Sequence, residues 1–150
     1  MSLGYKEPTL VKGGKVVDDR GSLSFINEFT LENFKRFYLV HNHERGFIRA
    51  WHGHKNEAKG IVAVRGSIVV GAVKMSNVIN PDKSQVPERF VLSSDTPSIL
   101  IVPSGYANGF KTLSEDALVL IFSSSTLDES KDDDYRFSYD YWNIWDVEPR

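Results

Sequence analysis

The fold is decided by the stretch Gly46-Phe-Ile-Arg-Ala-Trp-His52-Gly-His54-Lys-Asn-Glu-Ala-Lys59-Gly-Ile-Val-Ala-Val-Arg-Gly66. Apolar, aromatic and β-branched residues fill both of its ends, a composition that favours strands. Arg65-Gly66 predicts a tight turn, because glycine supplies the positive φ that a hairpin requires. We therefore expect a two-strand ribbon over Gly60–Val64 and Ser67–Lys74.

The same pattern of short β-branched and aromatic segments, bounded by Gly, Pro, Asn and Asp, continues on both sides of this stretch. The candidate strands are Ser22–Glu28, Arg36–Val40, Phe47–His52, Gly60–Val64, Ser67–Lys74, Arg89–Leu92, Ser98–Val102 and Ala117–Ser123. Eight strands suffice for a jelly roll, so the sequence predicts an all-β sandwich or barrel. Helix is expected only as one turn over Thr30–Phe34, capped by Thr30.

Composition narrows the functional classes. A chain of 150 residues with 41% hydrophobic residues is expected to form one domain over 1–150. Cysteine is absent, which rules out disulfides and thiol nucleophiles, and the net charge of -2 with no basic stripe argues against nucleic-acid or membrane surfaces. The apolar runs are far below the ~20 residues that cross a bilayer. We expect a cytoplasmic protein.

The C-terminal third contains two segments of contrasting character. Residues Asp128–Asp134 are acidic and are expected to form a solvated loop, since like charges repel and are costly to bury. Six aromatic residues then fall within positions 135–145, which is too apolar for a free tail. We expect them to pack on the barrel or on a partner subunit.

Chemistry is concentrated in the central stretch. Strand geometry places His52 and His54 on one face, and the same alternation sends Arg49 to the other face unless the strand bulges between 49 and 52. Lys59 begins an apolar strand, and an unpaired buried ammonium is costly, so it is expected in a pocket. His41 and His43 lie at a neighbouring strand end and are expected at the surface or rim.

The spacing G-x5-H-x-H-x4-K-x6-G resembles the first motif of the cupin family. In that family two histidines and a following Glu bind a divalent metal with a later His. Here Lys59 stands at the Glu position, and Asn108 stands at the His position in Pro103-Ser-Gly105-Tyr-Ala-Asn108. An ammonium has no lone pair, and amides are poor ligands for zinc or iron. We therefore predict a pocket without metal or other cofactor, in which the fixed cation of Lys59 stabilises an enolate or a bound anion.

A closer resemblance is to the dTDP-4-dehydrorhamnose 3,5-epimerase (RmlC-like) family. It rests on Asp19-Arg20-Gly21, Arg49-Ala-Trp-His52, Ala58-Lys59-Gly-Ile-Val and Pro103-Ser-Gly105-Tyr-Ala-Asn108-Gly-Phe110. The resemblance implies that Arg20 contacts phosphate or substrate across a homodimer, that His52 is the catalytic base and that Lys59 stabilises the enolate. It also implies an Asp near the C-terminus that orients the His. Asp140 is the candidate, with Asp134 and Asp146 as alternatives.

Two departures leave the reaction open. The family's acidic Tyr after the last core strand is missing from Ser123-Ser-Ser-Thr-Leu127-Asp128, which argues against double epimerisation unless Tyr38, Tyr106 or Tyr139 reaches the site from elsewhere. His52-Gly-His54-Lys55 is similar to the H-A-H-K of dTDP-sugar 3,4-ketoisomerases, which are cupins that use both histidines.

The epimerase is the favoured interpretation and the ketoisomerase the second. A non-catalytic nucleotide-sugar or carbohydrate binding module, and last a metal-dependent cupin, complete the alternatives. The other expected substrate-binding residues are Arg49 and Asn108, with Trp51, Tyr106 and Phe110 available to stack on a base.

Overall fold

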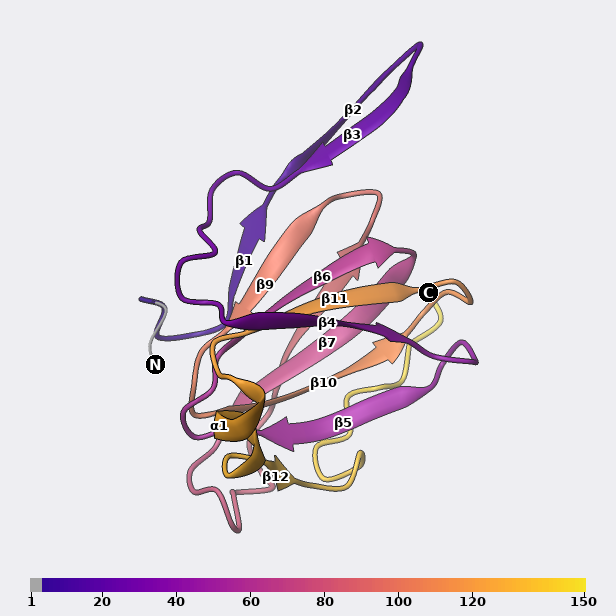
Figure 1. Cartoon of the computed structure of the whole chain (residues 1–150). Helices are drawn as coiled ribbons and strands as arrows, with labels where there is room; N and C mark the ends of the chain where they lie inside the picture. The colour runs from indigo at the N-terminus through magenta and orange to yellow at the C-terminus, as the bar shows by residue number, and fades with distance from the viewer. Residues whose placement is uncertain (1–3) are drawn as a thin grey trace.

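The structure is a computed structural model that describes residues 4–150. It contains strands β1 Thr9–Lys12, β2 Gly14–Asp18, β3 Gly21–Phe25, β4 Arg36–His41, β5 Ile48–Gly53, β6 Lys59–Arg65, β7 Ser67–Lys74, β8 Glu88–Ser93, β9 Ser98–Val102, β10 Tyr106–Thr112, β11 Leu118–Ser123 and β12 Tyr135–Arg136, with one helix, α1 Leu127–Lys131. Five strands form one sheet in the order β1-β9-β6-β11-β4, and five form a second in the order β12-β5-β10-β7-β8. Neighbouring strands are antiparallel throughout (Figure 1).

The core lies between these two sheets. Ile61, Leu100 and Val119 of the first sheet meet Ile68 and Val70 of the second, and all are almost fully buried. Alternate residues of the strands supply these side chains, as expected when one face of a sheet is buried. The predicted all-β jelly roll is confirmed, and so is each of the eight predicted strands to within a few residues.

The predicted β6–β7 ribbon is wrong. The two strands belong to different sheets, and Gly66 turns the chain from one sheet to the other with φ 73°. A Cβ at Gly66 would lie 2.2 Å from Ser114 Oγ, so the turn needs glycine for space as well as for conformation. Positive φ identifies a sharp turn in the sequence but does not identify which strand pairs with which.

A turn is present where the sequence predicted one, but the helix that the structure shows within residues 4–150 lies elsewhere. Residues 30–34 form a single turn, closed by the Phe34 N–H bonded to the Leu31 carbonyl at 3.0 Å. Helix α1 instead forms within the acidic segment expected to be a loop. A capping box starts it: Thr126 Oγ1 accepts the Glu129 N–H, and the Glu129 carboxylate accepts the Thr126 N–H. No helix within residues 4–150 has the length and apolar composition that a membrane crossing requires.

Strand β5 contains a bulge. Asn108 of β10 pairs with His52 and Phe110 pairs with Arg49, so Ala50 and Trp51 together face the single residue Gly109. A Cβ on Gly109 would lie 2.4 Å from the Ala50 Cβ, which explains the glycine there. The extra residue brings Arg49 and His52 to the same side of the sheet, as the sequence required if both serve one site.

The aromatic C-terminus packs on the outer face of the second sheet, which confirms that it is no free tail. Trp51 is fully buried there against Trp142 and Trp145, with ring centroids 5.3 and 5.1 Å away. Its indole N–H is shared between the carbonyls of Tyr139 and Trp142 at 3.0 and 3.2 Å. The tail therefore supports β5 from behind.

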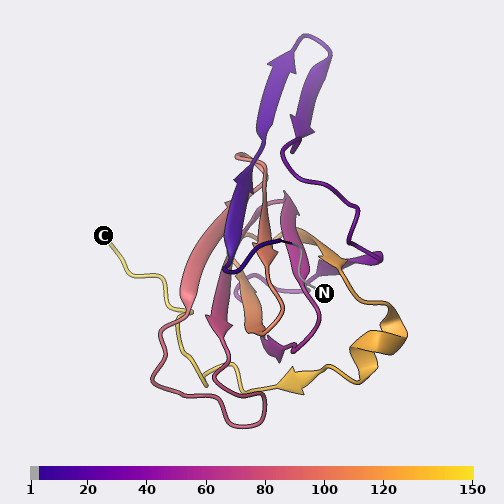
Figure 2. The same ribbon diagram turned by 90° about the vertical axis from the view of Figure 1, so that its left-hand side faces the viewer.

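One part of the chain stands apart from both sheets. Strands β2 and β3 pair only with each other and project beyond the barrel as an arm (Figures 1 and 2). Val16, Val17 and Leu23 on this arm are 56%, 74% and 64% exposed. We call residues 14–25 the β2–β3 arm.

Candidate active site

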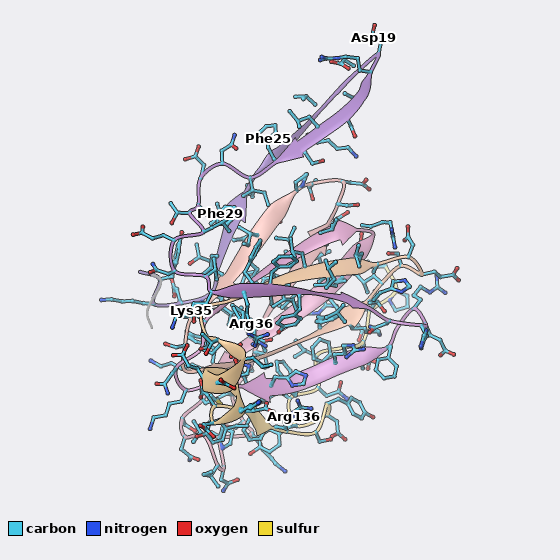
Figure 3. All side chains as sticks on the ribbon, viewed as in Figure 1. Asp19, Phe25, Phe29, Lys35, Arg36 and Arg136 are labelled. Carbon is cyan, nitrogen blue, oxygen red and sulfur yellow. The ribbon has the colours of Figure 1, made fainter. Side chains whose placement is uncertain are left out.

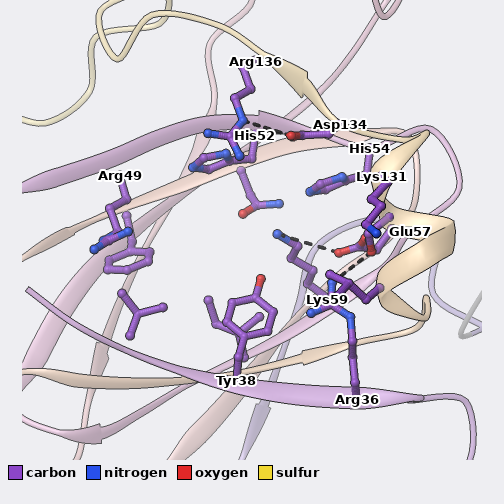
Figure 4. A pocket seen from close by; sticks show the side chains of 16 residues that line it. Arg36, Tyr38, Arg49, His52, His54, Glu57, Lys59, Lys131, Asp134 and Arg136 are labelled. Atoms are coloured by element: carbon purple, nitrogen blue, oxygen red, sulfur yellow. Dashed lines mark hydrogen bonds and ion pairs between the residues drawn. The ribbon is translucent and has the colours of Figure 1, made fainter.

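A cavity of about 340 Å³ opens between the two sheets at the end where α1 lies (Figure 4). The second sheet contributes the two histidines of β5, the first sheet contributes Tyr38 of β4 and Lys59 of β6, and α1 covers one end. The lining residues are Arg36, Tyr38, Val40, Arg49, His52, His54, Glu57, Lys59, Asn108, Phe110, Ile121, Leu127, Ser130, Lys131, Asp134 and Arg136. Five of the nine sequence-predicted site residues are among them: His52, His54, Lys59, Arg49 and Asn108.

His52 faces the cavity from the bulged strand, and within residues 4–150 no hydrogen bond holds either of its ring nitrogens. Burial, followed by the positive charges of Lys59 and Arg136, lowers its pKa to about 4, which Asp134 opposes. The imidazole is therefore neutral near pH 7 and has a lone pair free to take a proton.

His54 is held more rigidly. Its Nδ1 lies 2.7 Å from the carbonyl oxygen of Asp133, and because a carbonyl only accepts, Nδ1 must carry the hydrogen. Nε2 is then the unprotonated nitrogen, and it is buried without a partner among residues 4–150. Burial and Lys59 also lower the pKa of His54, which keeps it neutral. A buried acceptor without a donor is costly, so this nitrogen is suited to a hydroxyl that arrives with a ligand.

Lys59 is 7% exposed and has a buried partner. Its Nζ lies 3.8 Å from Oε2 of Glu57, whose other oxygen accepts a 2.6 Å hydrogen bond from Ser130 Oγ. Ser130 Oγ in turn accepts from Arg36 at 2.9 Å. This chain of contacts links β4, β6 and α1, and it leaves the ammonium beside both histidines as a fixed positive charge.

Tyr38 occupies the wall opposite the histidines. Figure 4 shows its hydroxyl directed into the cavity from β4, across from His52 and His54 of β5. The Lys59 Nζ lies 6.0 Å from its ring centroid, and the Arg36 guanidinium lies 5.2 Å from it. No hydrogen bond within residues 4–150 uses the Tyr38 hydroxyl. Of the three tyrosines proposed from sequence, Tyr38 alone lines the cavity.

The remaining sequence-predicted residues are not brought to the cavity. Asp140 is exposed and its carboxylate accepts a hydrogen bond from Ser138, whereas Asp134 lies beside His52 and pairs with Arg136 at 3.0 Å. Trp51 points to the opposite face of its sheet, because the bulge that turns His52 inward turns Trp51 outward.

Tyr106 packs against the core and does not line the cavity. Arg20 lies at the tip of the β2–β3 arm, paired with Asp18, and Figure 3 shows the neighbouring Asp19 far from α1 and Arg36.

Several site residues escaped the sequence prediction, and two signals were available. Thr126-Leu-Asp-Glu129 is a capping-box pattern that predicts a helix at the cavity end. Glu57 lies two residues before Lys59, the spacing that places both on one side of an extended segment. No comparable signal identifies the buried Asp133, whose neighbours Asp132 and Asp134 are both exposed.

The donor set does not fit the metal that the cupin motif accommodates elsewhere. An ammonium and an amide stand at two ligand positions, and Arg49 and Arg136 also line the cavity. Within residues 4–150, no three His, Asp or Glu side chains are grouped as a metal site needs. The arrangement favours an anionic ligand, held by fixed cations and touched by two neutral imidazoles.

The fold and this cavity define a cupin-type jelly roll that combines an H-x-H pair with a lysine. The sequence profile of the FdtA family, which is described as "WxcM-like, C-terminal", matches residues 6–145. The chain therefore belongs to the FdtA family. No curated protein sequence matches it.

Solved structures of both enzyme groups that the motifs resemble share the fold. A dTDP-4-dehydrorhamnose 3,5-epimerase from Bacillus anthracis, with TDP and PPi bound, is 25% identical with a TM-score of 0.76 over 95% of this chain and 86% of its own. The QdtA 3,4-ketoisomerase from Thermoanaerobacterium thermosaccharolyticum, in complex with TDP, is 20% identical with a TM-score of 0.65 over 91% and 92%. The WlaRB TDP-quinovose 3,4-ketoisomerase from Campylobacter jejuni is 20% identical, with a TM-score of 0.65 over 92% of this chain and 98% of its own.

Proposed function

We propose that this protein is an isomerase of dTDP-4-keto-6-deoxyhexoses and that it moves the ketone between C4 and C3. The sequence alone favours the epimerase, and one observation shifts the balance: the unpartnered Nε2 of His54 lies in the same cavity as His52. Inverting a carbon needs one base and one acid, whereas moving a ketone also requires a hydroxyl proton to change oxygens. A second neutral imidazole with a fixed tautomer suits that additional transfer.

The proposed reaction has balanced proton transfers. His52 takes the proton from C3, and the electron pair of that C–H bond forms the C3=C4 double bond while O4 becomes an enolate beside Lys59. His54 Nε2 accepts the O3 hydroxyl proton and returns a proton to O4. The proton on His52 is then delivered to C4, and the new C=O forms at C3. Both histidines end neutral, as they began.

Electrostatics support the two assignments. Because the pKa of His52 is about 4, its protonated form is a strong acid that readily returns the proton to carbon. The same low pKa makes it a weak base, so abstraction depends on stabilisation of the enolate. A buried ammonium is well placed for this, because its field is little screened by water. Lys131, Arg36 and Arg136 at the α1 end of the cavity offer contacts for a diphosphate.

A second candidate, the 3,5-epimerase, is favoured by Tyr38. Its free hydroxyl faces the histidines from the other wall, as an acid must to protonate the opposite face of an enolate. The B. anthracis epimerase also has the highest TM-score of the three structures compared.

A homodimer completes the proposal. In a single subunit the β2–β3 arm projects away from the barrel and exposes Val16, Val17 and Leu23. An apolar arm of this kind is suited to lie on a partner subunit, where Arg20 would reach the partner's nucleotide sugar. This assembly would supply Arg20, a predicted substrate contact that is remote from the cavity within one subunit.

The test is proton NMR of dTDP-4-keto-6-deoxyglucose incubated with the protein in deuterated water, with His52→Asn as control. A product with its ketone at C3 is the expected result, and it carries deuterium at C4 in those turnovers in which protonated His52 exchanges with solvent before it delivers the proton. Inversion at C3 or C5 with the ketone still at C4 would replace this proposal with the epimerase. Binding of the sugar nucleotide without any exchange would replace both with the non-catalytic binding module.

A further inference from the structure

We propose that Asp133 is a positioning residue that sets the tautomer of His54, the histidine assigned above to the hydroxyl proton. Asp133 is 4% exposed, although it lies in an acidic segment of the chain. Its backbone carbonyl accepts the Nδ1 hydrogen of His54. Its carboxylate accepts three backbone N–H groups: those of Lys55 at 2.6 Å, Asn56 at 2.9 Å and Glu57 at 2.9 Å. We call these four contacts the Asp133 clamp.

The clamp joins two parts of the chain that are almost eighty residues apart. On one side, residues 54–57 lie between the catalytic strand β5 and Lys59. On the other, Asp133 lies between α1 and β12. Ala58 adds a second connection, donating its N–H to Ser124 Oγ at 2.8 Å and accepting from the Ser124 N–H at 3.0 Å. The carbonyl facing His54 is therefore held in place by bonds from the segment that carries His54.

The chemistry of the clamp explains why a carboxylate is needed. Both oxygens are used as acceptors, one for Lys55 and one shared by Asn56 and Glu57. An amide at this position presents an oxygen to one side and an NH2 group to the other, and the NH2 group faces donors. Asp133→Asn therefore loses at least one contact and creates a donor–donor conflict. The carbonyl is then free to leave His54, and the imidazole can place its hydrogen on Nε2.

The consequence for the reaction rests on the proposed function. With hydrogen on Nε2, His54 donates where the substrate hydroxyl also has to donate, so the hydroxyl proton has no acceptor. Binding of the nucleotide uses other side chains and is largely kept. The variant should therefore lose kcat by about tenfold or more while KM changes by less than about threefold, as expected for an interaction used in the transition state.

The decisive experiment is long-range 1H–15N NMR of the full chain with 15N-labelled histidine, which reports which ring nitrogen carries hydrogen. His54→Asn identifies the His54 signals, and Asp132→Asn is the matched control, because Asp132 is an exposed acid next to Asp133. We expect a protonated Nδ1 and a bare Nε2 in the wild type and in Asp132→Asn, and a mixture of tautomers in Asp133→Asn. A folded Asp133→Asn variant that keeps the pure Nδ1–H form would overturn the proposal.

Two further outcomes keep the test decisive. If Asp133→Asn does not fold, Asp133→Glu takes its place, since it keeps the charge but displaces both oxygens by one methylene. If neither folds, the wild type decides, because a His54 with hydrogen on Nε2 contradicts the proposal by itself. The NMR result does not depend on turnover: a protein inactive on every sugar that still shows this tautomer change loses the proposed function and keeps the Asp133 clamp.

Discussion

The α1 end of the barrel and the β2–β3 arm differ in whether their side chains find partners within one subunit. At the α1 end, charged groups are buried and paired: Asp133 accepts three N–H groups, and Glu57 contacts Lys59 and Ser130. On the arm, apolar groups are exposed, and its strands pair only with each other. The first region pairs its charged groups within one subunit, whereas the exposed apolar groups of the second suit the partner subunit that we propose. We therefore expect substitutions at the α1 end to leave assembly intact, whereas loss of the proposed dimer would remove Arg20 from the partner's site.

The largest expected effect is at the α1 end. His54→Asn removes the free lone pair, so the rate of ketone migration should fall by about 10³-fold, within the range for a lost general acid–base group. Deuterium exchange at C3 should survive, because His52 remains. Initial rates and exchange by NMR measure both. His43→Asn is the control, since His43 is exposed and outside the cavity. Intact ketone migration in His54→Asn would remove His54 from the mechanism.

Charging the arm should have the next largest effect. Val16 and Leu23 are direct cross-strand partners and lie on one face. Placing Asp at both should weaken dimerisation by about 100-fold or more, because each buried side chain is worth roughly 1.5–3 kcal/mol. Sedimentation velocity over a concentration series measures this, with Ser24→Asp on the other face as control. A wild-type protein that stays monomeric at high concentration contradicts the contrast between the two regions.

Acid should weaken the α1 end before the arm. The pKa of His52 is about 4 in the folded protein and about 6.5 when unfolded, so the unfolded chain binds more protons between these values. The stabilisation is complete above pH 6.5 and is lost as pH falls toward 4, by at most about 3 kcal/mol from this group. His54 contributes with the same sign. Urea unfolding at several pH values measures the free energy of unfolding as a function of pH. Between pH 6.5 and 4 this free energy should fall less steeply in His52→Gln than in the wild type. An equally steep fall in both proteins would assign the pH dependence to other groups.

The smallest effect concerns how α1 begins. Thr126→Ala removes the side chain that accepts the Glu129 N–H, and loss of such a cap costs about 1 kcal/mol. This cost is measured as a shift of the midpoint of urea unfolding at an unchanged m value. Asp128→Asn is the comparison, since Asp128 is 92% exposed at its side chain and makes only a 3.4 Å surface contact with Lys131. Equal effects in the two variants would mean that the capping box does not hold the cavity end.

Much of the fold follows from the sequence because it is encoded locally. β-Branched segments such as Ser67–Lys74 and Ser98–Val102 need only their own composition to indicate strands, and the observed bounds agree. Strand pairing is a non-local property, so the turn at Gly66 was assigned correctly but the hairpin around it was not. Strand β10 was not predicted because Gly105 and Gly109 resemble loop residues, although the second glycine is required by close packing.

The site divides in the same way. His52, His54 and Lys59 share one local motif and were found from its spacing. Tyr38 lines the cavity and Asp133 contacts His54, but both come from parts of the chain far from this motif. Only the pairing of β4 with β11 and of β12 with β5 brings them near. The choice of Asp140 over Asp134 depended on a resemblance in the tail, where a shift of a few residues decides which acid meets the histidine.

The bulge in β5 makes the number of residues in that strand as important as their identity. The two residues between Arg49 and His52 lie opposite the single residue Gly109, and this shifts the alternation of inward and outward side chains by one residue. If these residues paired in regular register, Arg49 and His52 would point to opposite faces: Arg49 would enter the outer aromatic layer or His52 would leave the cavity. Deleting Ala50 would remove the bulge and still keep both side chains on the cavity side, because a single residue would then separate them. The bulge therefore lets a strand with two residues between these functional groups present them as a regular strand does with one.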